Sequence, residues 1–108
     1  MTERFDPHVF DAPNMRDAYQ RCWDEATDSS VEGYVDDWIL STLPWDFQLR
    51  DIAVPVFSWF GENDVLVPRN EAERVSAEIP QSVSIGCPDC RHYVPIAHWP
   101  EILEQTAL

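Results

Sequence analysis

Two residues of this sequence, Asp64 and His92, have the types and positions needed for acid–base chemistry. A carboxylate that holds one nitrogen of an imidazole fixes the tautomer of the ring. The other nitrogen can then take a proton from a nucleophile and return it to a leaving group. Asp64 follows closely on an apolar run of the chain, and His92 follows a second, weaker one. The pair therefore predicts acyl-transfer chemistry if the fold brings the two side chains together.

The elements that must position this pair are two strands and the helix between them. Residues 54–60 are β-branched and aromatic with a proline only at the second position, which is typical of a strand buried on both faces. Residues 68–79 have a helical pattern, and residues 83–87 predict a second strand. A right-handed crossover makes the two strands parallel and places both following loops at one edge of the sheet. Asp64 and His92 are therefore expected to meet.

The motifs around both residues closely resemble the last third of an α/β-hydrolase. They read Gly61-Glu62-Asn63-Asp64-Val65-Leu66-Val67-Pro68 and, after the helix and strand, Arg91-His92-Tyr93-Val94-Pro95. In that family the triad follows the chain order nucleophile, acid, histidine. The resemblance, which covers residues 49–108, assigns the acid to Asp64 and the histidine to His92. Glu62 competes by proximity, but the family pattern places the acid three residues after Gly61.

The nucleophile of the family is not found in this sequence. It sits in a small-residue elbow such as GxSxG, and the glycines Gly33, Gly61 and Gly86 form no such elbow. The sequence is therefore expected to be the carboxyl-terminal segment of an esterase, lipase or peptidase type of hydrolase, inactive alone. In the complete enzyme the resemblance implies a small-molecule ester or amide substrate and no cofactor. The resemblance also implies that the nucleophile and the pocket, rather than these two loops, distinguish the substrates of the family.

The amino-terminal part of the chain is expected to be helical. Residues 1–13 contain two prolines and no periodicity, which predicts an extended arm. Asn14 is placed as the N-cap of a first amphipathic helix, and Ser29 with Glu32 has the spacing of a capping box for a second one. Residues 34–47 resemble the return from the lid of the family. The expected apolar faces are Met15, Tyr19, Cys22, Trp23 and Ala26 in the first helix and Val31, Tyr34, Val35, Trp38 and Ile39 in the second.

The expected fold class is α/β, as a partial α/β-hydrolase fold. It comprises two parallel strands with a crossover helix, a carboxyl-terminal helix and amino-terminal lid-like helices. Residues 1–48 form the lid-like helical segment, and residues 49–108 form the carboxyl-terminal α/β-hydrolase segment. A last helix is expected to begin at Pro100 behind the packing anchor Trp99 and to bury Ile102, Leu103 and Leu108.

Cys87 and Cys90 form a rival site, because a CxxC pair can be a redox centre or half of a zinc site. A redox pair gains a reactive thiolate from a helix N-terminus, and Pro95 argues against a helix directly after Cys90. Zinc would need four ligands in a tetrahedral arrangement, and the candidates are Cys87, Cys90, His92 and His98. Only one residue separates Cys90 from His92, which makes the loop too cramped for that arrangement. A thiol or zinc site is the less favoured interpretation. The main alternative to the hydrolase segment is a non-catalytic interaction module derived from the same fold. His98 itself is expected to start a helix or to pack, and His8 to be exposed.

Composition limits the partners. The formal net charge is −13, from 20 acidic residues against 7 basic ones that are all arginine, so nucleic acid is not an expected partner. The lysine-free acidity reflects either adaptation to high salt or a lineage bias. The sequence shows no signal-peptide pattern and no apolar stretch near the ~18 residues of a membrane span, which predicts a cytoplasmic location and no membrane partner. An apolar strand with few neighbours predicts self-association, docking onto a complementary hydrolase fragment, or a partly molten chain.

Overall fold

The computed structural model describes residue 6 and residues 8–107. In chain order its elements are η2 (Val9–Asp11), α1 (Met15–Thr27), α2 (Glu32–Thr42), η3 (Leu49–Asp51), β1 (Val56–Gly61), α3 (Arg69–Ala77), β2 (Ser82–Cys87), α4 (Val94–Ala97) and α5 (Trp99–Thr106). This part of the chain is mixed α/β, with five α-helices and a two-stranded sheet. The predicted α/β class is confirmed at this level.

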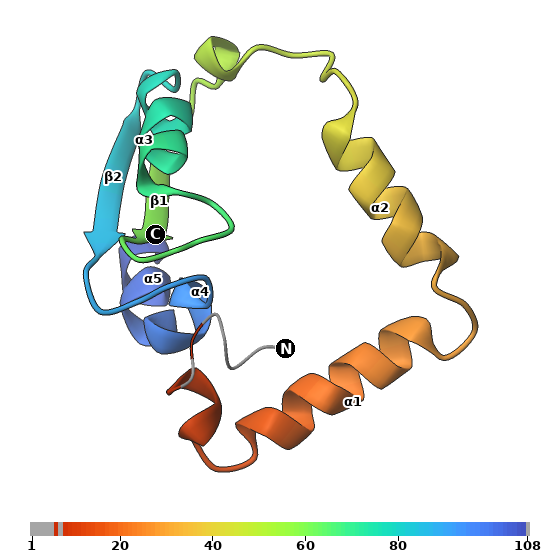
Figure 1. Ribbon diagram of the computed structural model, residues 1–108. Helices are drawn as coiled ribbons and strands as arrows, with labels where there is room; N and C mark the ends of the chain where they lie inside the picture. The colour runs from red at the N-terminus through yellow and green to blue at the C-terminus, as the bar shows by residue number, and fades with distance from the viewer. Residues whose placement is uncertain (1–5, 7, 108) are drawn as a thin grey trace.

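The two strands are parallel, as predicted, and α3 crosses between them. Their register runs from Val56 opposite Ser82 to Gly61 opposite Cys87. The strand β1 begins one residue after Pro55, which has no amide hydrogen, and the amide of Val56 donates to the carbonyl of Gln81 (3.0 Å). The helix α3 contacts both strands. The crossover therefore directs both following loops to the carboxyl edge of the sheet (Figure 1).

The predicted burial of residues 54–60 on both faces is wrong. Val54 lies before the strand and is 62% exposed, and Phe57 within β1 is also exposed, whereas Phe60 and Gly61 are buried. Among the described residues β1 pairs with β2 alone, and of the helices α3 and α4 make the main contacts with it. An apolar strand is covered only where neighbouring elements reach it. The core accordingly lies at the carboxyl end of β1, where Trp59 packs on Cys87, Cys90 and Val94.

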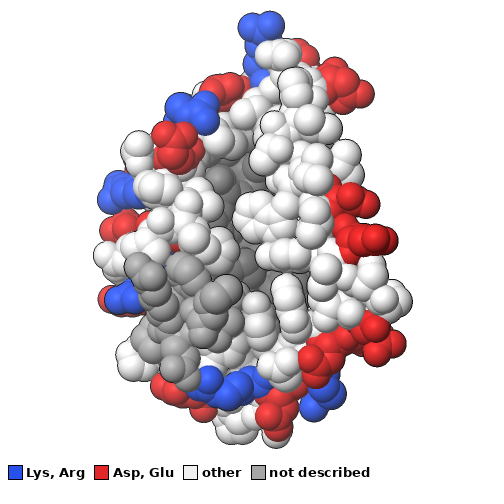
Figure 2. Space-filling view, turned by 45° about the vertical axis from the view of Figure 1, so that its right-hand side comes forward, with Lys and Arg blue, Asp and Glu red and all other residues white. Residues whose placement is uncertain are grey.

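The helices α1 and α2 form an excursion of the chain that leaves the α/β part and returns to it at η3 (Figure 1). Both predicted helices exist, but α1 has no buried residue and every residue of α2 is exposed. In Figure 2 uncharged side chains border a hollow, and acidic side chains lie along the outer edge of its right-hand wall. The described residues therefore leave the predicted apolar faces largely uncovered.

Of the two predicted helix caps, Asn14 takes the N-cap position of α1 as expected, and the one at Ser29 is wrong. Asn14 precedes α1 as expected, but its side chain makes no cap hydrogen bond, and its φ of 65° places it in the left-handed region that asparagine tolerates. The capping box at Ser29 is wrong, because Ser30 Oγ accepts the hydrogen bond from the amide of Glu32 (3.1 Å). Position Val31 takes the N-cap place of α2.

The carboxyl-terminal region contains two helices, where one was predicted from Pro100. The helix α4 ends at Ala97, and α5 begins after His98. Pro95 and Pro100 each lie in the first turn of a helix, where a missing amide hydrogen is harmless. The predicted burial of Leu103 is wrong, because this residue is exposed. Trp99, the expected packing anchor, is 55% exposed, and Leu108 lies outside the described residues. Trp59 holds α5 to the sheet by donating through Nε1 to Gln105 (2.8 Å).

The predicted extended arm at residues 1–13 is wrong over the residues that the structure describes. It contains the single turn η2, and Phe10 in that turn is buried. The ring of Phe10 packs edge-on against Tyr19 (5.3 Å) and Tyr93 (5.2 Å). This aromatic contact fixes η2 against the loop that follows β2. None of the described helices is long and apolar enough to cross a membrane.

Candidate functional site

The structure brings Asp64 and His92 into hydrogen-bond contact. Asp64 lies three residues beyond the end of β1, and His92 lies in the loop between β2 and α4. The distance between His92 Nδ1 and Asp64 Oδ2 is 3.0 Å. The Asp64 side chain is 7% exposed and that of His92 is 36% exposed. The expectation that the crossover lets the two side chains meet is therefore met, while their catalytic role stays a prediction.

The second oxygen of Asp64 is held by its own loop. Asp64 Oδ1 accepts hydrogen bonds from the amides of Leu66 (2.8 Å) and Val67 (3.2 Å), as aspartates in turns commonly do. Burial raises the pKa of the Asp64 carboxyl, but the hydrogen bonds from His92 and from the two amides outweigh it and leave the pKa below its ordinary value. The carboxylate is therefore ionised at neutral pH and suited to orient an imidazole.

The contact determines what the imidazole can do. A neutral ring that donates from Nδ1 to Asp64 carries its basic lone pair on Nε2. Both side chains line a pocket of about 360 Å³ between β1, α3 and α4. Its other lining residues include Ser58, Phe60, Val67, Val75 and Val94. The arrangement suits general-base catalysis on a group presented in an apolar pocket.

The two loops are joined by backbone contacts as well as by this side-chain pair. The amide of Glu62 donates to the carbonyl of Cys87 (3.0 Å), and the side-chain amide of Asn63 donates to the carbonyl of Pro88 (2.6 Å). A Cβ atom at Gly61 would lie 1.9 Å from the carbonyl oxygen of Arg91. Only glycine permits so close an approach between the strand end and the histidine loop.

One contributor to the site carries no signal in the sequence. Asp6 Oδ1 accepts from the amide of Arg91 (2.8 Å), and Asp6 Oδ2 accepts from the amide of Tyr93 (2.5 Å). These two residues flank His92 directly. Asp6 lies 85 residues from Arg91 in an arm without periodicity, so neither spacing nor pattern indicates the contact.

The cysteines of the rival site are free thiols in the core. The pKa values of Cys87 and Cys90 are both raised, chiefly by burial, and the mutual contact of the thiols adds to the shift at Cys87. A raised pKa keeps a thiol protonated and unreactive at neutral pH. No group of three or more His, Cys, Asp or Glu side chains within residues 6 and 8–107 is arranged to hold a metal ion.

The other two histidines lie where the sequence predicts. His98 stands at the start of α5, with its ring 5.8 Å from that of Trp59 and its Nδ1 3.5 Å from a carboxylate oxygen of Glu101. His8 has a 94% exposed side chain next to Asp11. Neither imidazole contacts a buried carboxylate, so His92 is distinct among the three.

No protein-family model matches the chain, and a search of the curated proteins returns no match.

Proposed function

We propose that this chain supplies the acid and the histidine of a hydrolytic triad, and that the nucleophile comes from sequence outside these 108 residues. The observation that carries the proposal is the hydrogen bond of 3.0 Å between His92 Nδ1 and the buried carboxylate of Asp64. The resemblance of both loops to the last third of an α/β-hydrolase gives the chain order of the triad.

In this mechanism His92 acts as the general base. Its Nε2 takes the proton of a hydroxyl or thiol nucleophile as that nucleophile attacks the carbonyl carbon of a small ester or amide. The imidazolium then returns the proton to the leaving alkoxide or amine. Asp64 stabilises the imidazolium without taking the proton. Burial raises the pKa of Asp64, but its hydrogen bonds lower it by more, so the carboxylate stays ionised. A second turn of the same steps, with water as the nucleophile, releases the acid.

The chain alone is expected to hydrolyse esters at the background rate, because the nucleophile and the oxyanion donors are missing from it. Loss of a triad function typically reduces the rate by several orders of magnitude. Hydrolysis of a p-nitrophenyl ester by the purified chain, abolished by His92→Ala, would show instead that a nucleophile is present within it.

The decisive test uses the chain as it occurs in its own cells. The tagged chain is recovered with whatever polypeptide binds it, and the complex is treated with a fluorophosphonate reporter and assayed with p-nitrophenyl esters. We expect ester hydrolysis, or a labelled serine on the bound polypeptide, that is lost in His92→Ala and kept in the matched control His98→Ala. A bound polypeptide without either activity would refute the triad proposal.

A non-catalytic interaction module is the second candidate, and one observation favours it. Every residue of α2 is exposed, including the apolar side chains Tyr34, Val35, Trp38 and Ile39, and exposed apolar patches mark interaction surfaces. In this case the complex survives His92→Ala and the wild-type complex shows no hydrolysis. Disruption by Trp38→Ser, without any effect of His92→Ala, would support this candidate.

A further inference from the structure

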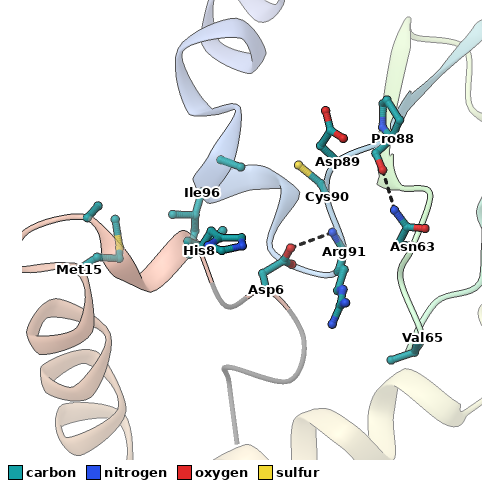
Figure 3. A pocket seen from close by; sticks show the side chains of 13 residues that line it. Asp6, His8, Met15, Asn63, Val65, Pro88, Asp89, Cys90, Arg91 and Ile96 are labelled. Atoms are coloured by element: carbon teal, nitrogen blue, oxygen red, sulfur yellow. Dashed lines mark hydrogen bonds between the residues drawn. The ribbon is translucent and has the colours of Figure 1, made fainter.

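Asp6 is a buried carboxylate at the start of the chain, far in sequence from the site that it touches. The residue is only 6% exposed. Its two oxygens accept hydrogen bonds from the amides of Arg91 and Tyr93, the residues immediately before and after His92. Figure 3 shows the Asp6 side chain directed at the backbone of Arg91, on the side of the loop that faces η2 and α4.

We propose that Asp6 is a positioning residue that holds the His92 loop in the conformation in which the imidazole meets Asp64; its importance for catalysis rests on the proposed function. A carboxylate is rigid and planar, so accepting from two amides fixes their relative orientation. Hydrogen bonds to an ionised acceptor are also stronger than neutral ones. Because His92 lies between these two amides, its backbone has little freedom left to turn the ring away from Asp64.

The arm that carries Asp6 is itself anchored. Phe10 is 4% exposed and packs against the rings of Tyr19 and Tyr93, whose hydroxyl groups lie 3.3 Å apart. Burial, with the hydrogen bond to Tyr19, raises the pKa of Tyr93 to about 12, so the phenol stays protonated and keeps that hydrogen bond at neutral pH. The segment of Asp6 and η2 is thus anchored to α1 and to Tyr93, and this anchor keeps Asp6 in place beside the histidine loop.

The other side of the loop is fixed by different contacts. Asn63 donates to Pro88 through its side chain (2.6 Å), as Figure 3 also shows, and its amide donates to the carbonyl of Cys90 (3.3 Å). These contacts secure the part of the loop before His92. Among the described side chains, that of Asp6 accepts hydrogen bonds from backbone amides on both sides of the histidine. Its removal should therefore free the ring without separating the two strands.

The test reads the His92 ring by nitrogen-15 NMR of the full chain, so it needs neither a nucleophile nor a substrate. The variants are Asp6→Ala and Asp6→Asn, and the matched control is Asp11→Asn, an exposed carboxylate of the same arm that contacts His8. Asparagine offers one accepting oxygen and one donating amide, so it can satisfy only one of the two backbone amides. We expect the Nδ1 proton of His92 to exchange with water about tenfold faster or more in Asp6→Ala, with a smaller increase in Asp6→Asn and none in the control.

Amide hydrogen exchange separates positioning from general support of the fold. We expect Asp6→Asn to lower protection at Arg91 and Tyr93 and to leave the amides of Trp59 and Ile85 in the sheet unchanged. An unchanged Nδ1 signal, or an equal loss of protection in the loop and in the sheet, would overturn the inference. Either result stands whether or not a nucleophile is found on a bound polypeptide, so the failure of this inference and the failure of the triad proposal are distinguishable.

Discussion

The loop that carries His92 and the helix α2 differ in how far along the chain their hydrogen-bond partners lie. The partners of the loop belong to distant segments, and those of α2 are near neighbours in sequence. In the loop, backbone amides and carbonyls pair with Asp6, with Asn63 and with the end of β1, and Val94 beside it is buried. In α2 the side-chain hydrogen bonds stay within the helix and its first turn, and every residue is exposed. The described residues therefore supply the contacts that hold Asp64 and His92 together, whereas they leave the apolar side chains of α2 exposed.

The difference can be expressed in free energy. Burying one large apolar side chain stabilises a protein by roughly 1.5–3 kcal/mol, and α2 alone exposes several of them. The loop, by contrast, depends on hydrogen bonds whose partners are already present. Substitutions in the loop should therefore affect the chain on its own, and substitutions in α2 should affect what the chain binds.

The largest expected effect is that of Gly61→Ala. A Cβ there meets backbone atoms of Arg91 and Cys90, which cannot move aside without separating the histidine loop from β1. We expect a loss of about 3 kcal/mol or more in unfolding free energy, measured by urea titration. The matched control Gly33→Ala, in α2, meets nothing within 4 Å and should stabilise the helix by about 0.5–1 kcal/mol. Equal effects of the two changes would remove the distinction between the regions.

Trp38→Ser tests the lid-like helices. Trp38 is 60% exposed and has a ring contact with Tyr34, so its loss should change the unfolding free energy by less than about 0.5 kcal/mol. Association with a second copy or a complementary polypeptide should weaken by about tenfold or more, measured by sedimentation velocity. Asp36→Ser, on another face of the same helix, should leave association unchanged. A large loss of stability in Trp38→Ser would mean that α2 packs on the rest of the chain.

The pH dependence of the unfolding free energy tests whether the ionised Asp64 carboxylate stabilises the fold. Burial raises the pKa of Asp64, but hydrogen bonds from His92 and the two amides hold it below the ordinary value of 3.8. A carboxyl with a lowered folded-state pKa binds protons more readily when unfolded, so its stabilising effect is complete above about pH 4 and is lost as the pH falls through the folded-state pKa. The wild type should therefore lose more stability than Asp64→Asn between about pH 5 and about pH 2.5. Asp46→Asn is the matched control at an exposed position. A wild-type curve of stability against pH that runs parallel to that of Asp64→Asn would contradict the expectation.

Ser30→Ala has the smallest expected effect. Ser30 Oγ accepts from the amide of Glu32 in the first turn of α2, and such a cap contributes about 0.5–1 kcal/mol. The helical signal in circular dichroism should melt slightly earlier in this variant. Ser29→Ala should leave the melting curve unchanged. An earlier melting transition in Ser29→Ala than in Ser30→Ala would support the capping box at Ser29 that the sequence predicts.

The sequence was sufficient for the parts of the site that depend on nearby residues. The strand, crossover helix and second strand follow from short apolar patterns, and the parallel topology then brings Asp64 to His92 (3.0 Å). The sequence pattern favoured Ser29 and was wrong, because both serines suit a cap and the geometry of the turn selects Ser30. The burial of β1 and the contact of Asp6 depend on elements far away in the chain, for which periodicity has no signal.

The distance along the chain between contacting residues also has a consequence for how the structure closes. The Asp64–His92 contact joins residues 28 positions apart, whereas the Asp6–Arg91 contact joins residues 85 positions apart. The entropy lost on closing a flexible loop grows with the logarithm of its length, so the longer closure costs about 1 kcal/mol more. The acid and the histidine can thus come together while the arm is still free. Docking of Asp6 then closes the chain into a ring that includes α1 and α2, and lengthening the turn between these helices should add little to the free energy of closure.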